Sequence, residues 1–216
     1  MIKSYAVCFL LFFIYTASFG QIEKDLLSVS EEVNKERYSD YDGSPYYYTE
    51  WQSGDIITSD GKHHNHNQIN FNGFTGDLEI MDGTSVRKLL TGGYLKVIVN
   101  INDRTDTFLR GIHPTFNLDL ICVSYDGKRL KLLTQFGVST EKFQDKIAGG
   151  EKFNRRYNHY LLFDDKLESC SLRKKKIINI LGHGDEIEAY LKQNKLSVRS
   201  TDELASFLAY FEANIL

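Results

Sequence analysis

The chain has 216 residues, and its composition predicts a folded protein of mild negative charge. Its 26 basic and 29 acidic residues give a net charge of -3, which offers no electrostatic footprint for nucleic acid. Aromatic residues make up 13% of the chain and there are two prolines, a composition that excludes a disordered protein. We therefore expect one domain, with room for an appendage, that binds no nucleic acid.

The first 20 residues have the pattern of a secretory signal peptide. Lys3 precedes an unbroken apolar run over 6–15, and the small residues Ser18 and Gly20 follow, two positions apart. The apolar run is shorter than the roughly 20 residues that span a bilayer. We expect export, cleavage after Gly20, and no transmembrane segment afterwards; the alternative is an uncleaved anchor.

Residues 21–45 are expected to form a helical lead-in and a linker. Segment 21–37 is polar and has few large apolar residues, which suits a helix lying loosely on the domain. Segment 38–45 is rich in turn residues and is typical of a connection. Two further units are expected after it, an antiparallel β domain over 46–172 and a C-terminal helical segment over 173–216.

The β domain is predicted from short strands separated by turns. Strands are expected at 55–59, 68–71, 77–81, 84–90, 94–101 and 107–112. Asp-Gly recurs at irregular intervals, which indicates a meander and not a repeat. Segment 138–156 is expected to be irregular, and a last hairpin is expected over 157–172 with its turn at Asp164-Asp165.

The clearest hairpin signal lies in residues 116–136. Two β-rich runs flank Asp126-Gly127, which favours a two-residue turn with positive φ. That turn would place Ile121 opposite Leu132 on a face that packs on the core. The opposite face, which carries Cys122, is expected to be covered by the C-terminal helices.

The C-terminal segment predicts about three short helices, over 173–181, over 185–194 and after Ser200. Asp185 with Glu188, and Ser200 with Glu203, have the spacing of a capping box. The last helix carries the apolar stripe Leu204, Phe207, Leu208, Phe211 and Ile215. Because strands precede helices, the expected class is α+β: a curved antiparallel β-meander or partial barrel followed by a C-terminal bundle.

Several short motifs resemble an uncharacterised family of exported proteins from Bacteroidetes-type Gram-negative bacteria. They are Gly43-Ser44-Pro45-Tyr46, Glu50-Trp51, Gly54, Asp60-Gly61-Lys62, Arg156-Tyr157, Tyr160, Lys174-Lys175-Lys176, Asn194-Lys195-Leu196 and Asp202-Glu203-Leu204 leading to Tyr210. Where the family has a Leu-Arg-Tyr-Asn-like strand, this chain has Ile69-Asn70-Phe71-Asn72. The family has no known activity, so the resemblance implies only a periplasmic or outer-membrane-associated location.

Three histidines, His63, His64 and His66, are the candidate metal ligands. On a strand, His64 and His66 point to the same face and could share a Zn²⁺ or Cu²⁺ ion. A further ligand would have to come from elsewhere, for example Asp60. The alternative is a polar hairpin edge beside an Asp-Gly turn.

An aromatic cluster, Tyr46, Tyr47, Tyr48 and Trp51, is the candidate ligand-binding surface. These rings could stack on a sugar or peptide. Alternatively, they seal one end of the sheet, in which case they have no ligand of their own.

Two cysteines beyond the signal pattern, Cys122 and Cys170, are candidates for a disulfide because the chain is expected to be exported. Their pairing depends on a Cα approach that the sequence does not specify. The alternative for each is a packed thiol.

The function expected from these patterns is that of an exported cell-envelope protein with a non-enzymatic binding or structural role. Its partner would be another envelope protein or a small ligand. No Gly-rich phosphate loop, serine elbow or Cys-x-x-Cys pair is present, so no catalytic residue or cofactor is expected. Two alternatives stay open: a small-ligand carrier using the cavity of the sheet, and a metal-assisted hydrolase at His63, His64 and His66.

Overall fold

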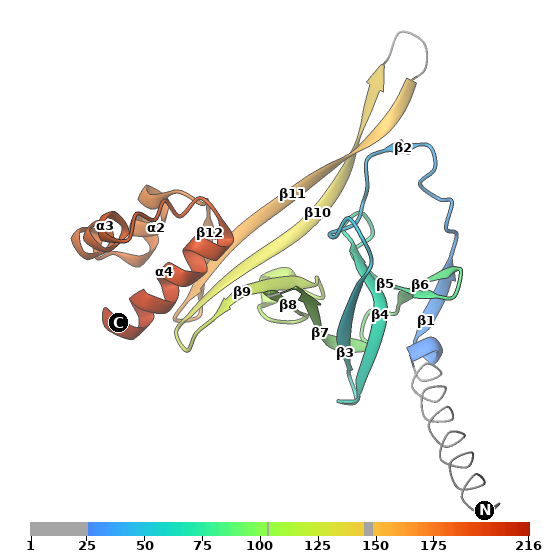
Figure 1. Ribbon diagram of the computed structural model, residues 1–216, viewed down its shortest axis with the longest axis horizontal. Coiled ribbons are helices and arrows are strands. Elements are labelled where there is room, and N and C mark those ends of the chain that lie inside the picture. Colours follow the sequence, from blue (N-terminus) through green and yellow to red (C-terminus); the bar gives the residue numbers. More distant parts are fainter. Residues whose placement is uncertain (1–25, 103, 145–148) are drawn as a thin grey trace, which may run out of the picture.

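The computed structural model describes residues 26–102, 104–144 and 149–216. Their strands form one 12-stranded sheet, and helices follow at the C-terminal end (Figure 1). The predicted signal peptide over 1–20 lies outside the described residues. Within the described part, no helix is both long enough and apolar enough to cross a membrane.

The elements follow one another along the chain with short connections. The strands before the middle of the chain are β1 (Ser30–Val33), β2 (Tyr41–Asp42), β3 (Gln52–Thr58), β4 (His63–Asn72), β5 (Asp77–Asp82), β6 (Ser85–Leu89), β7 (Tyr94–Ile101) and β8 (Arg104–Leu109). The later elements are the 3-10 helix η1 (Pro114–Phe116), β9 (Ile121–Asp126), β10 (Leu130–Gln144), β11 (Gly149–Phe163), β12 (Lys166–Cys170), α2 (Lys174–Leu181), α3 (Gly184–Gln193) and α4 (Thr201–Asn214).

The α+β expectation is confirmed, but the purely antiparallel meander is wrong. The order across the sheet is β1-β6-β5-β4-β3-β7-β8-β9-β10-β11-β12, and β2 pairs with β11. The β2–β11 ladder is parallel, so the sheet is mixed, and it is open because β1 and β12 lie at opposite ends of the order. The strand β2 falls in the predicted linker; its partner lies far along the chain, so local turn composition could not show it.

The predicted lead-in helix is also wrong over most of its described part. Residues 26–28 are helical, but β1 follows and pairs antiparallel with β6, from Ser30↔Leu89 to Val33↔Val86. Leu26 is buried in the core beneath the first strands. Pairing with a distant strand therefore overrides the helical preference of this segment.

The segment predicted to be irregular, 138–156, instead belongs to a long two-stranded ribbon. β10 and β11 pair from Leu130↔Phe163 to Gln144↔Gly149, and the ribbon extends away from the helices past β2 (Figure 1). Neither face of its outer part is continuously buried, so the apolar alternation that signals a half-buried strand is missing there. The last hairpin is as predicted, with Asp164 and Asp165 both at positive φ, 46° and 64°.

The register of the β9–β10 hairpin differs from the predicted one. Asp126 pairs with Lys131 and Tyr125 with Leu132, and an irregularity follows between Leu132 and Leu133. The connection is therefore longer than two residues, and the irregularity turns Val123 to the opposite face from Leu132.

This hairpin separates three apolar clusters. The first fills the N-terminal strands and includes Ile56, Ile69, Phe71, Tyr94, Val97, Phe108, Leu120, Cys122 and Phe136. The second joins the sheet to the helices and includes Leu130, Leu132, Leu161, Cys170, Ile177, Ile187, Leu204, Phe207 and Phe211. The third is Phe116, Ile121, Val123, Leu133 and Leu162. The helices pack against Leu132. Cys122 pairs with Thr134 and so lies on the same face of the sheet as Leu132, but it packs in the first cluster and not under the helices. The prediction that the helices cover Cys122 is therefore wrong.

Of the N-terminal caps predicted for the last two helices, one is present and the other is not. The side chain of Ser200 accepts a hydrogen bond from the N–H of Glu203 at 3.2 Å, as predicted for α4. The predicted cap at Asp185 is wrong, because α3 begins after His183, a residue with φ 53° whose side chain makes no cap hydrogen bond.

Candidate ligand-binding site

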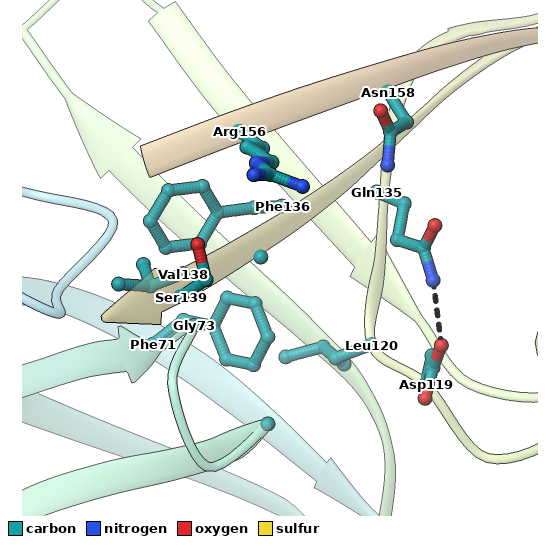
Figure 2. A pocket seen from close by; sticks show the side chains of 12 residues that line it. Phe71, Gly73, Asp119, Leu120, Gln135, Phe136, Val138, Ser139, Arg156 and Asn158 are labelled. Carbon is teal, nitrogen blue, oxygen red and sulfur yellow. Dashed lines mark hydrogen bonds between the residues drawn. The ribbon is translucent and has the colours of Figure 1, made fainter. Parts of the chain in front are cut away.

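A groove opens along the edge of β10 where its neighbouring strand ends, and we call it the β10 groove (Figure 2). β9 pairs with β10 as far as Ile121↔Gln135. Further along β10, the N–H of Val138 donates to the carbonyl of Gly73 at 2.9 Å. The β4–β5 turn therefore replaces β9 as the neighbour of β10 at this point. Between these two points lies a cavity of about 350 Å³.

The floor of the β10 groove is apolar and belongs to the first core cluster. Phe71, Leu120 and Phe136 are buried, and the half-buried Val138 packs against them. The rings of Phe71 and Phe136 lie 5.9 Å apart at a steep angle. Because a packed core holds these side chains in place, the floor is rigid before any ligand arrives.

Two glycines shape the groove in different ways. A Cβ added to Gly73 would lie 2.3 Å from a ring carbon of Phe136, so only glycine lets the β4–β5 turn approach this ring. A Cβ added to Gly137 would meet nothing within 4 Å. The backbone of β10 is therefore open to solvent at Gly137, in the wall of the groove.

Polar side chains form the rim. The carboxylate of Asp119 accepts a hydrogen bond from Nε2 of Gln135 at 2.7 Å. Arg156 and Asn158 extend from β11, opposite Gly137 and Gln135. Asp119 lies on the far side of Leu120 from Arg156 (Figure 2). Arg156 is exposed, and its side chain makes no hydrogen bond or ion pair with any other residue that the structure describes.

The neighbouring arginine on β11, Arg155, differs from Arg156 because its guanidinium is hydrogen-bonded within the protein. Nη2 of Arg155 donates to the carbonyl of Tyr47 at 2.6 Å and to the hydroxyl of Tyr157 at 2.7 Å. Its guanidinium also lies 5.2 Å from the ring centre of Phe136. The guanidinium of Arg155 is therefore held by contacts within the protein, whereas the guanidinium of Arg156 is available to a ligand.

The aromatic residues predicted to bind a ligand make contacts within the protein. The hydroxyl of Tyr46 donates to Glu79 at 2.9 Å, and that of Tyr48 donates to Asp106 at 2.9 Å. Burial, followed by the nearby Asp106 carboxylate, raises the pKa of Tyr48 well above its ordinary value. Two further residues, Tyr47 and Trp51, are half-buried, and Tyr47 packs edge-on against Phe136 behind the groove. Ligand binding at these residues stays a prediction.

The three histidines are not assembled into a metal centre. His63 is exposed, His64 is 4% exposed and His66 is half-buried on β4. The ring Nδ1 of His64 is buried without a hydrogen-bond partner among the described residues. Asp60, the suggested further ligand, accepts a hydrogen bond from Thr58 at 2.6 Å and pairs with Lys62. Within the described ranges, no group of three His, Cys, Asp or Glu side chains could hold a metal ion.

The two cysteines are free and occupy different clusters. Cys122 lies in the cluster of the N-terminal strands and Cys170 in the cluster beneath the helices. The predicted disulfide is therefore not formed, because β10 and β11 lie between the two strands that carry these thiols.

Sequence reasoning missed the β10 groove because three distant segments build it. The sequence predicts the turn after Phe71, but it places Arg156 only in a motif of the family resemblance. The one local signal was the glycine at 137 inside a β-rich run, which is typical of a close approach or an open backbone position. Comparisons with protein-family models, with curated proteins and with solved structures find no match for this chain.

Proposed function

We propose that this chain is an exported cell-envelope protein that binds a small molecule in the β10 groove and has no enzymatic role. The observation that carries the binding proposal is the preformed groove itself, with an apolar floor, an open backbone at Gly137 and an unpaired cation at Arg156. Its volume of about 350 Å³ falls within the size range of small-ligand sites. The export proposal rests on the signal pattern over 1–20.

The two alternative functions have less support from the geometry. A carrier that encloses its ligand needs a hollow sheet interior, whereas buried side chains such as Ile56, Ile69 and Val97 fill the space between the N-terminal strands. A metal-assisted hydrolase needs converging ligands, and His63, His64 and His66 differ in burial and do not converge. Binding at the edge of an open sheet therefore fits the molecule better.

Binding in the groove can be tested with a neutral apolar fluorophore, N-phenyl-1-naphthylamine, titrated into the chain that begins at residue 21. We expect saturable fluorescence enhancement that a Gly137→Val variant abolishes, since valine would project into open space in the groove wall. The matched control is Thr140→Val, an isosteric change further along β10. Equal binding by the wild type and Gly137→Val would overturn the proposed site.

Export is tested separately by fractionating Gram-negative cells that express the full chain. We expect the protein in the periplasmic or outer-membrane fraction with its N-terminus at Gln21. Full-length protein in the cytoplasm would overturn the export proposal and leave the binding proposal to be decided by the titration.

A further inference from the structure

We infer that the ligand of the β10 groove is an apolar monocarboxylate of about medium-chain fatty-acid size, held by its head group at Arg156. This inference rests on the proposed binding function and adds the chemical class of the ligand. It follows from three features of the groove: the state of Arg156, the position of the opposing charge, and the size and polarity of the floor.

Arg156 is the cation that the fold leaves unused at this site. Its side chain reaches the groove from β11 and has no partner among the residues that the structure describes. A guanidinium presents a rigid fork of N–H donors that matches the two oxygens of a carboxylate. Asn158, two residues along the same face of β11, lies opposite Gln135 and so belongs to the Asp119 end of the rim, away from Arg156 (Figure 2).

The one carboxylate in the groove lining sets the direction of the ligand. Asp119 lies on the other side of Leu120 from Arg156 (Figure 2), and Gln135 already donates to it. An anionic head is therefore attracted to the Arg156 end and repelled from the Asp119 end. This arrangement favours a ligand with its charge at one end and its apolar chain lying toward Leu120.

The polarity and size of the groove floor indicate the body of the ligand, beyond its charged head group. Phe71, Leu120 and Phe136 offer apolar surface without a polar side-chain atom, so an uncharged hydrocarbon body is favoured there. The volume of about 350 Å³ is near the lower end of the range for small-ligand sites. A short acid fits this groove better than a large lipid does.

The inference is tested by isothermal titration of decanoate, decanamide and decylamine into the chain that begins at residue 21. Decanoate should bind more tightly than decanamide, and decylamine should bind most weakly. Arg156→Gln should weaken decanoate binding by roughly tenfold or more, because a hydrogen-bonded charge pair is lost. The same variant should leave decanamide binding unchanged. The control Lys175→Gln removes an exposed charge on α2 and should leave all three affinities as they are.

A second variant tests the assigned direction. Asp119→Asn removes the repelling carboxylate and should leave decanoate binding equal or tighter. A loss of decanoate affinity in Asp119→Asn, or an unchanged affinity in Arg156→Gln, would overturn the inference.

The failure of the inference can be told from the failure of the proposed function. If decanoate and decanamide bind equally and Gly137→Val abolishes both, the groove binds ligands but the assigned anionic head is wrong. If Gly137→Val changes the binding of none of the probes, including the neutral fluorophore, both proposals are overturned.

Discussion

The carboxylate of Glu212 on α4 accepts a hydrogen bond from the hydroxyl of Tyr125 on β9 at 2.6 Å. The same carboxylate accepts from the backbone N–H groups of Arg129 and Leu130 in the β9–β10 connection. Glu212, a side chain of the last helix, therefore fixes the conformation of the β9–β10 connection. The Asp126-Gly127 pair alone favours a two-residue turn there. Burial alone would raise the pKa of Glu212, but these hydrogen bonds outweigh it and lower the pKa.

We predict that Glu212→Ala lowers the free energy of unfolding by about 1–3 kcal/mol, because donors in the connection lose their acceptor. The lowered pKa means that this contribution is present above the unfolded-state pKa and is lost as the pH falls through the folded-state pKa. Urea denaturation at neutral and acidic pH measures both effects. Tyr125→Phe should couple to Glu212→Ala in a double-mutant cycle; additive effects would contradict the contact.

A second prediction concerns the buried carboxylate of Glu79, which is 1% exposed. Nη2 of Arg37 lies 2.6 and 2.7 Å from its two oxygens, and Nδ2 of Asn72 donates to it at 2.8 Å. Arg37→Met should cost about 3–5 kcal/mol in urea denaturation, because it leaves a buried charge without its counter-ion.

The double variant Arg37→Met, Glu79→Leu provides the control for this ion pair. Replacing both charges with apolar side chains should recover most of the lost stability. A double variant as unstable as Arg37→Met alone would show that packing, and not the uncompensated charge, caused the loss.

The two glycines of the β10 groove should respond to alanine with opposite signs. Gly73→Ala should destabilise the protein by about 1–3 kcal/mol, because the new methyl group overlaps the ring of Phe136. Gly137→Ala should stabilise it by about 0.5–1 kcal/mol, since it meets no atom and reduces the freedom of the unfolded chain. Thermal unfolding of the two variants checks the signs; a destabilised Gly137→Ala would contradict an open backbone there.

A pH-dependent term in stability is expected from His159 on β11. Its Nδ1 lies 2.9 Å from Oγ1 of the buried Thr134, and burial lowers its pKa below the ordinary 6.5. As the pH falls, the unfolded chain binds the proton first, so the unfolding free energy should decrease below about pH 6.5. His159→Gln should flatten this decrease, whereas His63→Gln, at an exposed position on β4, should not. Denaturation curves at pH 7.5 and 5.5, about one unit to either side, give the comparison.

The cysteines should be unreactive until the protein unfolds. Burial raises the pKa of Cys122 to about 12 and that of Cys170 to about 11, so neither thiol is ionised at neutral pH. Ellman's reagent should label neither in the native chain that begins at residue 21 and both in urea. Labelling of neither in urea, with a mass that shows an oxidised pair, would restore the disulfide prediction.

Local patterns predicted the parts of the fold that local contacts hold. The Ser200–Glu203 cap, the apolar stripe of α4 and the Asp164-Asp165 turn each depend on residues within a few positions of one another. Strand β7 was likewise predicted with its observed bounds. The candidate site could not be predicted in this way, because Gly73, Leu120 and Arg156 meet only in the folded sheet.

The sequence by itself determined that strands come before helices, and hence the α+β class. The reason is that the apolar periodicity of a strand or helix depends only on residues close together in the chain. The tertiary structure alone decided the pairings of β1 with β6 and of β2 with β11, and the shift of the β9–β10 register. Each of these depends on a partner far along the chain, such as Glu212 for the β9–β10 connection. The free energy that selects them comes from burial and hydrogen bonding across the assembled sheet, which no local window of the sequence contains.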